Sequence, residues 1–410
     1  MNGDVLFLCQ FFYPENVSSA TLPFDTAEYL ASCGFKVGAL CGYPKEYLGN
    51  VDVPKKETVS GVDIQRIKYI QLGRKSTLGR IVNYFSFTLS AFLHMGIFKK
   101  YRSVIVYSNP PILPAVAILA KKLFKTKLVF VAYDVYPEIG YASKSITKGN
   151  LIDKVMNAIN RSLYKNADKV VALTDEMKQF LLDNREGLAP ENVVTIANWA
   201  SEKSVEKSDE AYEHFGYTKD QFIVSYFGNM GTCQDIDTLL CTAKLMQQDD
   251  RVRFLMVGHG NKKESAKKYI TENNLSNVQL LDYLTGEDFK QAVAITSGFV
   301  VSLEKGLKGT CAPSKYYSYL QGGHPVIAIV EEDSYLAKEV ENEKIGFYIP
   351  VGDAEGLKKQ IESFCEQPQE CENMGKRART LYLEKYDKPI AMRKYEKLIL
   401  ETVRGREANE

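Results

Sequence analysis

The segment SLEKGLKGTCAPSKYYSYLQGGHPV, residues 302–326, gathers groups that could hold a charged and hydroxylated ligand. Glu304 offers a carboxylate, Lys315 offers an ammonium group, and Pro313 suits the first turn of a helix. Backbone N–H groups at 310–314 would be exposed before that helix. A sugar needs hydrogen-bond acceptors and a diphosphate needs donors and cations, so these groups predict a sugar-diphosphate site. The alternative is a loop solvated by lysines and an amphipathic helix rich in tyrosine.

Two glycine-bracketed segments follow apolar runs in the same half of the chain. Gly228 and Gly231 would let the backbone approach a ligand closely, and the helix expected after them offers its N-terminus to a phosphate. Gly258 and His259 end the second run and could contact a base or a ribose. The G-x-x-G pattern is a weak signal alone, and a tight turn explains the second segment about as well.

Asp235 and Asp237 form a D-x-D pattern, which some nucleotide-sugar enzymes use to hold a metal ion. At the start of a helix the same two acids interact favourably with the helix dipole, so the pattern does not require a metal. The four histidines show no metal-ligand spacing, and no cysteines form a C-x-x-C pair. We expect no metal and no cofactor.

Polar residues also follow the apolar runs of the first half of the chain. Ser18 and Ser19 stand near a helix start, where backbone N–H groups could bind an anion or the hydroxyls could cap the helix. Asn109 precedes two prolines and either contacts a ligand or belongs to an ordinary turn. Asp134 and Glu138 could take a proton from an acceptor hydroxyl or bind a sugar hydroxyl, the alternatives being helix capping and loop solvation.

Short apolar runs alternate with helical patterns along the chain, which predicts parallel β-α-β units. A polar segment near residue 206 separates two such sets. We therefore predict an α/β fold of two doubly wound domains facing each other across a cleft, with ligands at the carboxyl ends of the strands. The predicted boundaries are 1–198 for the first domain, 199–205 for a linker, 206–385 for the second domain, and 386–410 for a terminal helix that could pack back on the first.

The uncharged run IVNYFSFTLSAFLHMGIF, residues 81–98, is near the lower length limit for crossing a bilayer. Its serines, asparagine and histidine favour a mostly buried helix. Basic residues at positions 74, 75, 80, 99, 100 and 102 favour a helix that touches anionic lipid. The two interpretations are compatible, because one face can pack while the other meets lipid, and peripheral membrane contact through 74–102 is one expectation.

The composition is that of an ordinary globular protein, with 410 residues, 45 % of them apolar and 25 % charged. A net charge of +1 favours neither nucleic acid nor an acidic ligand as partner. The first residues, MNGDVLFLCQFF, lack the basic region of a signal peptide. Eight cysteines, several within apolar runs, fit reduced thiols in a reducing cytosol.

The order and spacing of six short motifs resemble the retaining family 4 glycosyltransferases of GT-B architecture, in particular their bacterial polysaccharide-assembly branch. The motifs span nearly the whole chain and are LCQFFYPE, YSNPP, DVYPE, YFGNMG, MVGHG and APSKYYSYLQGGHPVIA. The resemblance implies two Rossmann-like domains, a nucleotide-sugar donor, usually a UDP-sugar, in the C-terminal domain, and an acceptor against the N-terminal domain. It also implies that no metal is needed.

The residues and the resemblance together give a candidate site with three roles. The expected catalytic residues are Asp134, Glu304 and Lys315. The expected acceptor contacts are Asn109, Tyr133 and Glu138. The expected donor and diphosphate contacts are Ser18, Ser19, Gly228, Asn229, Met230, Gly231, Gly258, His259, Lys305, Lys308, Thr310, Pro313, Ser314, Tyr316 and Ser318.

The chain departs from the family pattern at positions that normally bind the donor. Two glutamates separated by seven residues are usual in the family, and the second binds the ribose; here Thr310 and Ser318 occupy their positions. The usual arginine and lysine after the first glycine loop are also missing, and Asn229 and Gln234 stand nearby. Lys315 or a neighbouring lysine could supply that charge. The nucleotide preference therefore stays open.

The leading interpretation is a retaining, metal-independent glycosyltransferase that acts in the cytosol at the inner face of the plasma membrane. It would move a sugar from a nucleotide diphosphate to a glycan or lipid-linked glycan in cell-surface polysaccharide synthesis, and the departing phosphate could itself accept the proton. One alternative is a sugar-nucleotide epimerase of the same fold, which needs no lipid-facing helix. Another is a non-catalytic partner subunit, which the serine at position 318 favours. Nucleic acid is not an expected partner.

Overall fold

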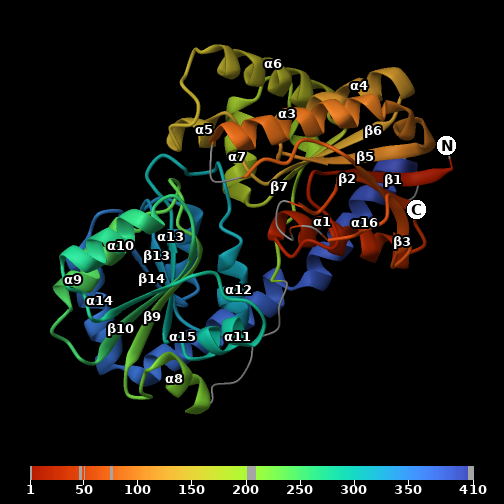
Figure 1. Cartoon of the computed structure of the whole chain (residues 1–410). Coiled ribbons are helices and arrows are strands. Elements are labelled where there is room, and N and C mark those ends of the chain that lie inside the picture. Colours follow the sequence, from red (N-terminus) through yellow and green to blue (C-terminus); the bar gives the residue numbers. More distant parts are fainter. Residues whose placement is uncertain (1, 46–48, 50, 74–76, 201–208, 405–410) are drawn as a thin grey trace. The chain divides into compact units, whose positions relative to one another are not determined.

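The structure of the chain is a computed structural model that describes residues 2–45, 49, 51–73, 77–200 and 209–404 (Figure 1). The chain forms two compact units. Unit 1 comprises residues 1–201, 309–312 and 388–410, and unit 2 comprises residues 202–308 and 313–387. Most of the predicted linker at 199–205, the predicted domain start at 206 and the last residues, 405–410, lie outside the described residues.

Unit 1 is built on an eight-stranded sheet in the order β3-β4-β2-β1-β5-β6-β7-β8. Its strands are β1 (Gly3–Leu8), β2 (Val37–Gly42), β3 (Lys56–Val59), β4 (Val62–Ile67), β5 (Tyr101–Tyr107), β6 (Lys127–Ala132), β7 (Lys169–Ala172) and β8 (Val193–Thr195). Neighbouring strands are parallel, except that β3 runs antiparallel to β4 at the edge. The central strands are apolar on both faces, because helices cover both sides of the sheet.

The helices of unit 1 divide between the two faces of its sheet. They are α1 (Ser18–Ser32), α3 (Thr77–Leu93), η1 (Met95–Lys100), α4 (Pro114–Phe124), α5 (Glu138–Ala142), α6 (Leu151–Asn166), α7 (Asp175–Asn184), η2 (Pro190–Asn192) and α16 (Lys388–Arg404). One core cluster joins α1 and α16 to the sheet residues Val5, Phe7 and Ile105. The other joins α3, α4, α6 and α7 to Leu6 and Val104 on the opposite face. The terminal helix α16 thus belongs to unit 1.

Unit 2 contains six parallel strands in the order β11-β10-β9-β12-β13-β14. The strands are β9 (Phe222–Asn229), β10 (Val252–His259), β11 (Val278–Leu281), β12 (Gly298–Ser302), β13 (Val326–Ile329) and β14 (Gly346–Ile349). The helices are α8 (Asp209–Phe215), α9 (Asp237–Leu245), α10 (Lys263–Glu272), α11 (Gly286–Ala294), α12 (Lys315–Gly322), α13 (Tyr335–Asn342), α14 (Ala354–Glu366), α15 (Pro368–Leu381) and the π-helix η3 (Tyr382–Tyr386).

Both faces of the unit 2 sheet are also covered. Helices α9, α10 and α14 pack on one face through a single apolar cluster that includes Tyr226 and Phe254. On the other face the Tyr319 ring of α12 stacks on Phe299 of β12 at 4.1 Å between ring centroids. The prediction of two doubly wound α/β domains with parallel sheets is therefore confirmed. Ligand-binding groups are to be sought at the carboxyl ends of these strands.

Two features bear on the sequence-based expectations about compartment and membrane. The eight cysteines are all free thiols in the structure. Among the described residues, none of the helices has both the length and the hydrophobicity to cross a bilayer. The run at 81–98 forms most of α3 and then η1, and only one face of α3 is buried.

Candidate functional site

Strands β9 and β10 of unit 2 end at two glycines with positive φ, and the second of them, Gly258, has no room for a side chain. Gly228 has φ of +115° and Gly258 has φ of +150°, values that residues with a side chain rarely adopt. A Cβ atom on Gly258 would lie 1.9 Å from the carbonyl oxygen of Gly228. The loop after β9 is also fixed by hydrogen bonds, because the Met230 amide donates to the His259 carbonyl at 2.6 Å. A ligand can thus approach this backbone closely, while substitution of either glycine would displace it.

Lys315, the first residue of α12, places a buried ammonium group beside Gly228. We call Gly228 and Gly258 together the glycine floor. The Lys315 Nζ lies 3.7 Å from the centre of the Tyr226 ring, and a Cβ on Gly228 would lie 3.6 Å from the same Nζ. This Nζ is buried and has no hydrogen-bond partner among the described residues. Burial lowers the pKa of the Lys315 amine to about 7. An amine that is desolvated without an acceptor is costly, so the site favours a ligand that brings negative charge.

A second ammonium group, that of Lys262, lies at the same edge of the sheet. Its Nζ donates to the Glu304 Oε1 at 2.5 Å and to the Gln234 carbonyl at 2.8 Å. Glu304 is held in place through its amide, which donates to the Cys233 carbonyl. The sequence analysis identified Glu304 but missed Lys262. Lys262 comes shortly after the glycine-bracketed end of β10, and this place in the sequence was the signal that could have identified it.

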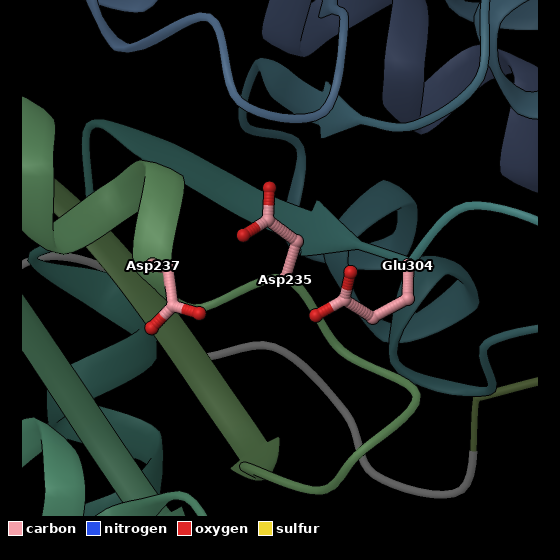
Figure 2. A group of neighbouring side chains, drawn as sticks. All are labelled: Asp235, Asp237 and Glu304. Atoms are coloured by element: carbon pink, nitrogen blue, oxygen red, sulfur yellow. The ribbon is translucent and has the colours of Figure 1, made fainter. Parts of the chain in front are cut away.

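The carboxylates of Asp235, Asp237 and Glu304 form a cluster whose ligand atoms lie within 4.8 Å of one another (Figure 2). The Asp235 carboxylate accepts hydrogen bonds from the amide and the hydroxyl of Thr238 in the first turn of α9. Glu304 is paired with Lys262, whereas Asp237 is exposed. Helix capping and ion pairing therefore explain two of the three carboxylates without a cation.

Replacing Asp235 by alanine should lower the free energy of unfolding by about 1 kcal/mol, because α9 loses the carboxylate that accepts from its first turn. Urea unfolding of the wild type and of Asp235→Ala, each in EDTA and in magnesium chloride, measures this. Asp237→Ala is the matched control, since no described residue donates to its carboxylate. Magnesium that stabilised the wild type but not Asp235→Ala would instead identify the cluster as a cation site.

In unit 1, Asp134 lies at the carboxyl end of β6 between two other segments. Its amide donates to the Ser108 hydroxyl at 3.0 Å, and its backbone pairs in antiparallel fashion with Cys311. The next amide, that of Val135, donates to the Thr310 carbonyl at 2.8 Å. Burial raises the pKa of the Asp134 carboxyl to about 6. A carboxylate with this pKa is a stronger base than that of an ordinary aspartate. Thr310, which was expected at the donor, lies beside Asp134 instead.

The three residues expected at the acceptor have different surroundings. The buried Oδ1 of Asn109 has no hydrogen-bond partner among the described residues, so it can accept from a ligand. The Tyr133 ring packs against Tyr107 at 5.0 Å between centroids, next to Asp134 in the chain. Glu138 instead forms a 2.6 Å ion pair with Arg185, so its carboxylate is already neutralised inside unit 1. Asn109 and Asp134 are the better-placed groups.

Several residues expected at the donor make other contacts. Helix α1 begins at Ser18 after the N-cap residue Val17, and no side chain caps it, so capping by Ser18 or Ser19 is not observed. The Tyr316 hydroxyl donates to the buried Glu339 at 2.6 Å, which directs this ring into the unit 2 interior. Lys308 pairs with Asp333.

The other donor candidates lie at the strand ends and near the start of α12. His259, at the end of β10, packs edge-on against the exposed Tyr283. Pro313 and Ser314 precede α12, and the Pro313 carbonyl accepts from the Tyr316 amide at 3.1 Å. Ser318 lies within α12 and Lys305 is exposed. The Gly231 amide donates to the Gln234 Oε1 at 3.0 Å, so Gln234 must move before that amide can bind an anion.

Comparisons with known proteins place both halves of the chain near sugar-transferring enzymes. Residues 24–199 match the family model "Glycosyl transferase 4-like domain", and residues 207–381 match "Glycosyl transferases group 1". The probable glycosyltransferase WbjE of Pseudomonas aeruginosa is 24 % identical over 291 residues, which cover 70 % of this chain and 72 % of WbjE.

Solved structures share the fold over nearly the whole chain. Sucrose-phosphate synthase of Thermosynechococcus elongatus is 16 % identical, with a TM-score of 0.76 over 96 % of this chain and 98 % of that one. Anabaena HepE, solved in complex with UDP-glucose, is 15 % identical, with a TM-score of 0.68 over 98 % of this chain and 99 % of that one. At these identities the structural likeness establishes the fold.

Proposed function

We propose, from the premise that this chain is a glycosyltransferase of the GT-B fold, that it moves a sugar from a UDP-sugar to a hydroxyl of a glycan or lipid-linked glycan. Transfer would retain the configuration at the sugar carbon and would need no metal ion. The observation that carries the donor assignment is the buried ammonium of Lys315, which has no acceptor among the described residues and lies beside Gly228.

The donor's diphosphate would lie over the glycine floor of unit 2. Negative charge accumulates on the diphosphate as the bond to the sugar breaks, so a fixed cation there stabilises the transition state more than the ground state. Lys315 would supply that cation, and because α12 begins at this residue, the positive end of the helix dipole would add to it. This arrangement supplies the positive charge that a metal ion provides in other transferases.

Glu304 and Asp134 would handle hydroxyl groups. Glu304 follows β12 and its carboxylate, although paired with Lys262, can accept from a hydroxyl of the donor sugar. Asp134 would accept the proton or a hydrogen bond from the attacking hydroxyl, because its pKa of about 6 leaves it ionised at pH 7 yet more basic than an ordinary aspartate. Asn109 would help to hold the same acceptor.

The comparisons support the choice of nucleotide and acceptor class without deciding them. HepE was solved with UDP and with UDP-glucose, which favours uridine as the base. The motif resemblance to bacterial polysaccharide-assembly enzymes favours a glycan acceptor, and retention of configuration rests on the same resemblance. Ser318, at the position where the family usually has a ribose-binding glutamate, makes the nucleotide the first property to measure.

A thermal-shift screen with UDP, GDP, ADP and their common sugar conjugates tests the donor directly. A UDP-sugar at about 100 times its dissociation constant should stabilise the chain by about 2.7 kcal/mol, whereas an unbound nucleotide leaves the unfolding temperature unchanged. Release of UDP from the best conjugate then distinguishes a transferase from a non-catalytic subunit. Release of the free sugar from the same conjugate, with water as the acceptor, distinguishes a transferase from an epimerase. No response to any nucleotide would contradict the proposed function.

A further inference from the structure

The face of α3 that points away from the sheet is apolar and exposed. Residues Gly79, Asn83, Phe87 and Ala91 form the buried stripe of this helix. The exposed apolar residues are Leu78, Phe85, Leu89, Phe92 and Leu93. At about 100° of rotation per residue, these five fall within an arc of roughly 100° opposite the buried stripe. The helix is therefore hydrophobic on the side that an ordinary surface helix leaves polar.

Two further helices on the same face of the sheet, α4 and α6, also expose apolar residues. Helix α4 packs against both α3 and α6, and all three cover the same face of the unit 1 sheet (Figure 1). Leu123 of α4 is exposed, as are Leu151, Ile152 and Val155 in the first turns of α6. We call these four residues and the five on α3 the outer helix surface. Nine of the sixteen large apolar side chains found exposed among the described residues lie on these three helices of one sheet face.

The charge around the outer helix surface has one sign. Residues 64–133 contain twelve lysines and arginines and no acidic residue, although the whole chain has a net charge of only +1. Four of the twelve pair with acids from outside this range: the buried Arg66 with Glu57, Arg102 with Asp4, and Lys121 and Lys127 with Asp168. Between 134 and 166 the chain adds three acids, none of which is exposed, and Asp153 among them is buried and bonded to Tyr141. Exposed basic residues on the same three helices are Arg80, Lys122, Lys154, Arg161 and Lys165.

Exposed apolar side chains flanked by exposed basic residues fit an anionic bilayer. Apolar side chains of an interfacial helix enter the boundary between headgroups and acyl chains, while lysines and arginines contact the anionic headgroups. A second copy of the chain fits less well, because it would bring two sets of basic residues together. We propose that the outer helix surface docks the protein on an anionic lipid bilayer.

Docking would also orient the carboxyl edge of the unit 1 sheet, where Asp134 lies. Helices that follow parallel strands begin at the carboxyl edge of the sheet, so Leu78 and Leu151, in the first turns of α3 and α6, lie toward the same edge as Asp134. A lipid-anchored hydroxyl would then reach this edge from the bilayer. The docking itself goes beyond the proposed transfer reaction and does not depend on it.

Vesicle flotation tests the apolar part of the proposal. The wild type should float with phosphatidylcholine vesicles that contain about 30 % phosphatidylglycerol, at about 0.1 M salt, and stay behind with pure phosphatidylcholine. The double variant Phe85→Ser/Leu89→Ser should lower the partition coefficient about tenfold or more. The matched control is Leu245→Ser/Leu383→Ser, which removes two exposed leucines of unit 2 and should bind as the wild type does.

Charge reversal tests the exposed basic residues independently. Lys122→Glu/Lys154→Glu should lower the partition coefficient by at least about tenfold, whereas Lys290→Glu/Lys376→Glu in unit 2 should leave it unchanged. Every variant is first checked for a wild-type unfolding temperature without ligand, which shows that it is folded and keeps this test independent of donor binding. The proposal is overturned if the wild type ignores anionic vesicles or if neither double variant weakens binding. It is likewise overturned if sedimentation shows a dimer that Phe85→Ser/Leu89→Ser dissociates.

Discussion

Lys315→Met should make the free protein more stable and, at the same time, remove most of its response to UDP-sugar. The Lys315 amine is buried without an acceptor, so an isosteric apolar side chain avoids its desolvation cost. The donor's diphosphate, however, would lose its cation in a site with little water. We expect kcat/KM to fall by about 10²- to 10³-fold, since loss of one such donor typically costs about 3 kcal/mol.

The pH dependence of donor binding gives a second measurement on the same residue. The pKa of Lys315 is about 7 in the free protein, and a bound diphosphate must raise it, because the anion favours the charged amine. UDP-sugar affinity should therefore be constant below pH 7 and fall by up to about tenfold per unit above it. UDP-sugar is a better probe than UDP, because its diphosphate carries no ionisable hydroxyl near neutrality.

Two variants and one contrary outcome complete this experiment. Lys338→Met, on the exposed side of α13, is the matched control and should change neither the stability nor the donor affinity appreciably. Lys315→Met should abolish the fall in affinity above pH 7. If it bound UDP-sugar as the wild type does, with the same pH profile, the diphosphate would have to lie elsewhere.

The alternation of apolar runs and helical patterns was enough to predict both sheets. Central strands such as β1 and β9 are buried on both faces, so their sequences are continuous apolar runs that are visible without structure. The edge strand β3 was not predicted, because its residues, KETV, are largely polar and partly exposed. Its pairing with β4 depends on a partner strand rather than on hydrophobicity.

The candidate site was predictable where backbone geometry dictates the residue type, and not where a side chain meets a distant partner. Gly228 and Gly258 are needed for positive φ and close approach, which leaves a trace in the sequence. The contact between Lys262 and Glu304 joins residues 42 positions apart, so nothing local indicates it. Tyr316 was expected at the donor, and its hydroxyl donates to Glu339 in the interior of unit 2, which is another contact between residues far apart in the sequence.

Asp134→Asn should lower kcat about 100-fold or more, because an amide keeps the shape of the carboxylate but cannot accept the proton of the attacking hydroxyl. The wild-type kcat/KM should also fall as the pH drops below about 6, where the carboxylate of Asp134 becomes protonated. In Asp134→Asn this acidic limb should be absent. UDP release from the best UDP-sugar, measured from pH 5 to pH 9, gives both quantities even with water as the acceptor.

Stability provides an independent check with a defined sign. Because burial raises the pKa of Asp134 in the folded protein, the folded state binds this proton more tightly than the unfolded state does. Asp134 therefore destabilises the folded protein as the pH rises through about 6 and its carboxyl ionises. Asp134→Asn should be more stable than the wild type at pH 8, and this gain in stability should be smaller at pH 4.

The exposed Asp183→Asn on α7 is the matched control for Asp134→Asn and should alter neither the rate nor this stability profile. A variant Asp134→Asn that was stabilised at pH 8 but retained full kcat would show that Asp134 is buried as described, yet does not take the proton. The proton would then pass to the departing diphosphate, which already carries the charge that the buried Lys315 is placed to stabilise.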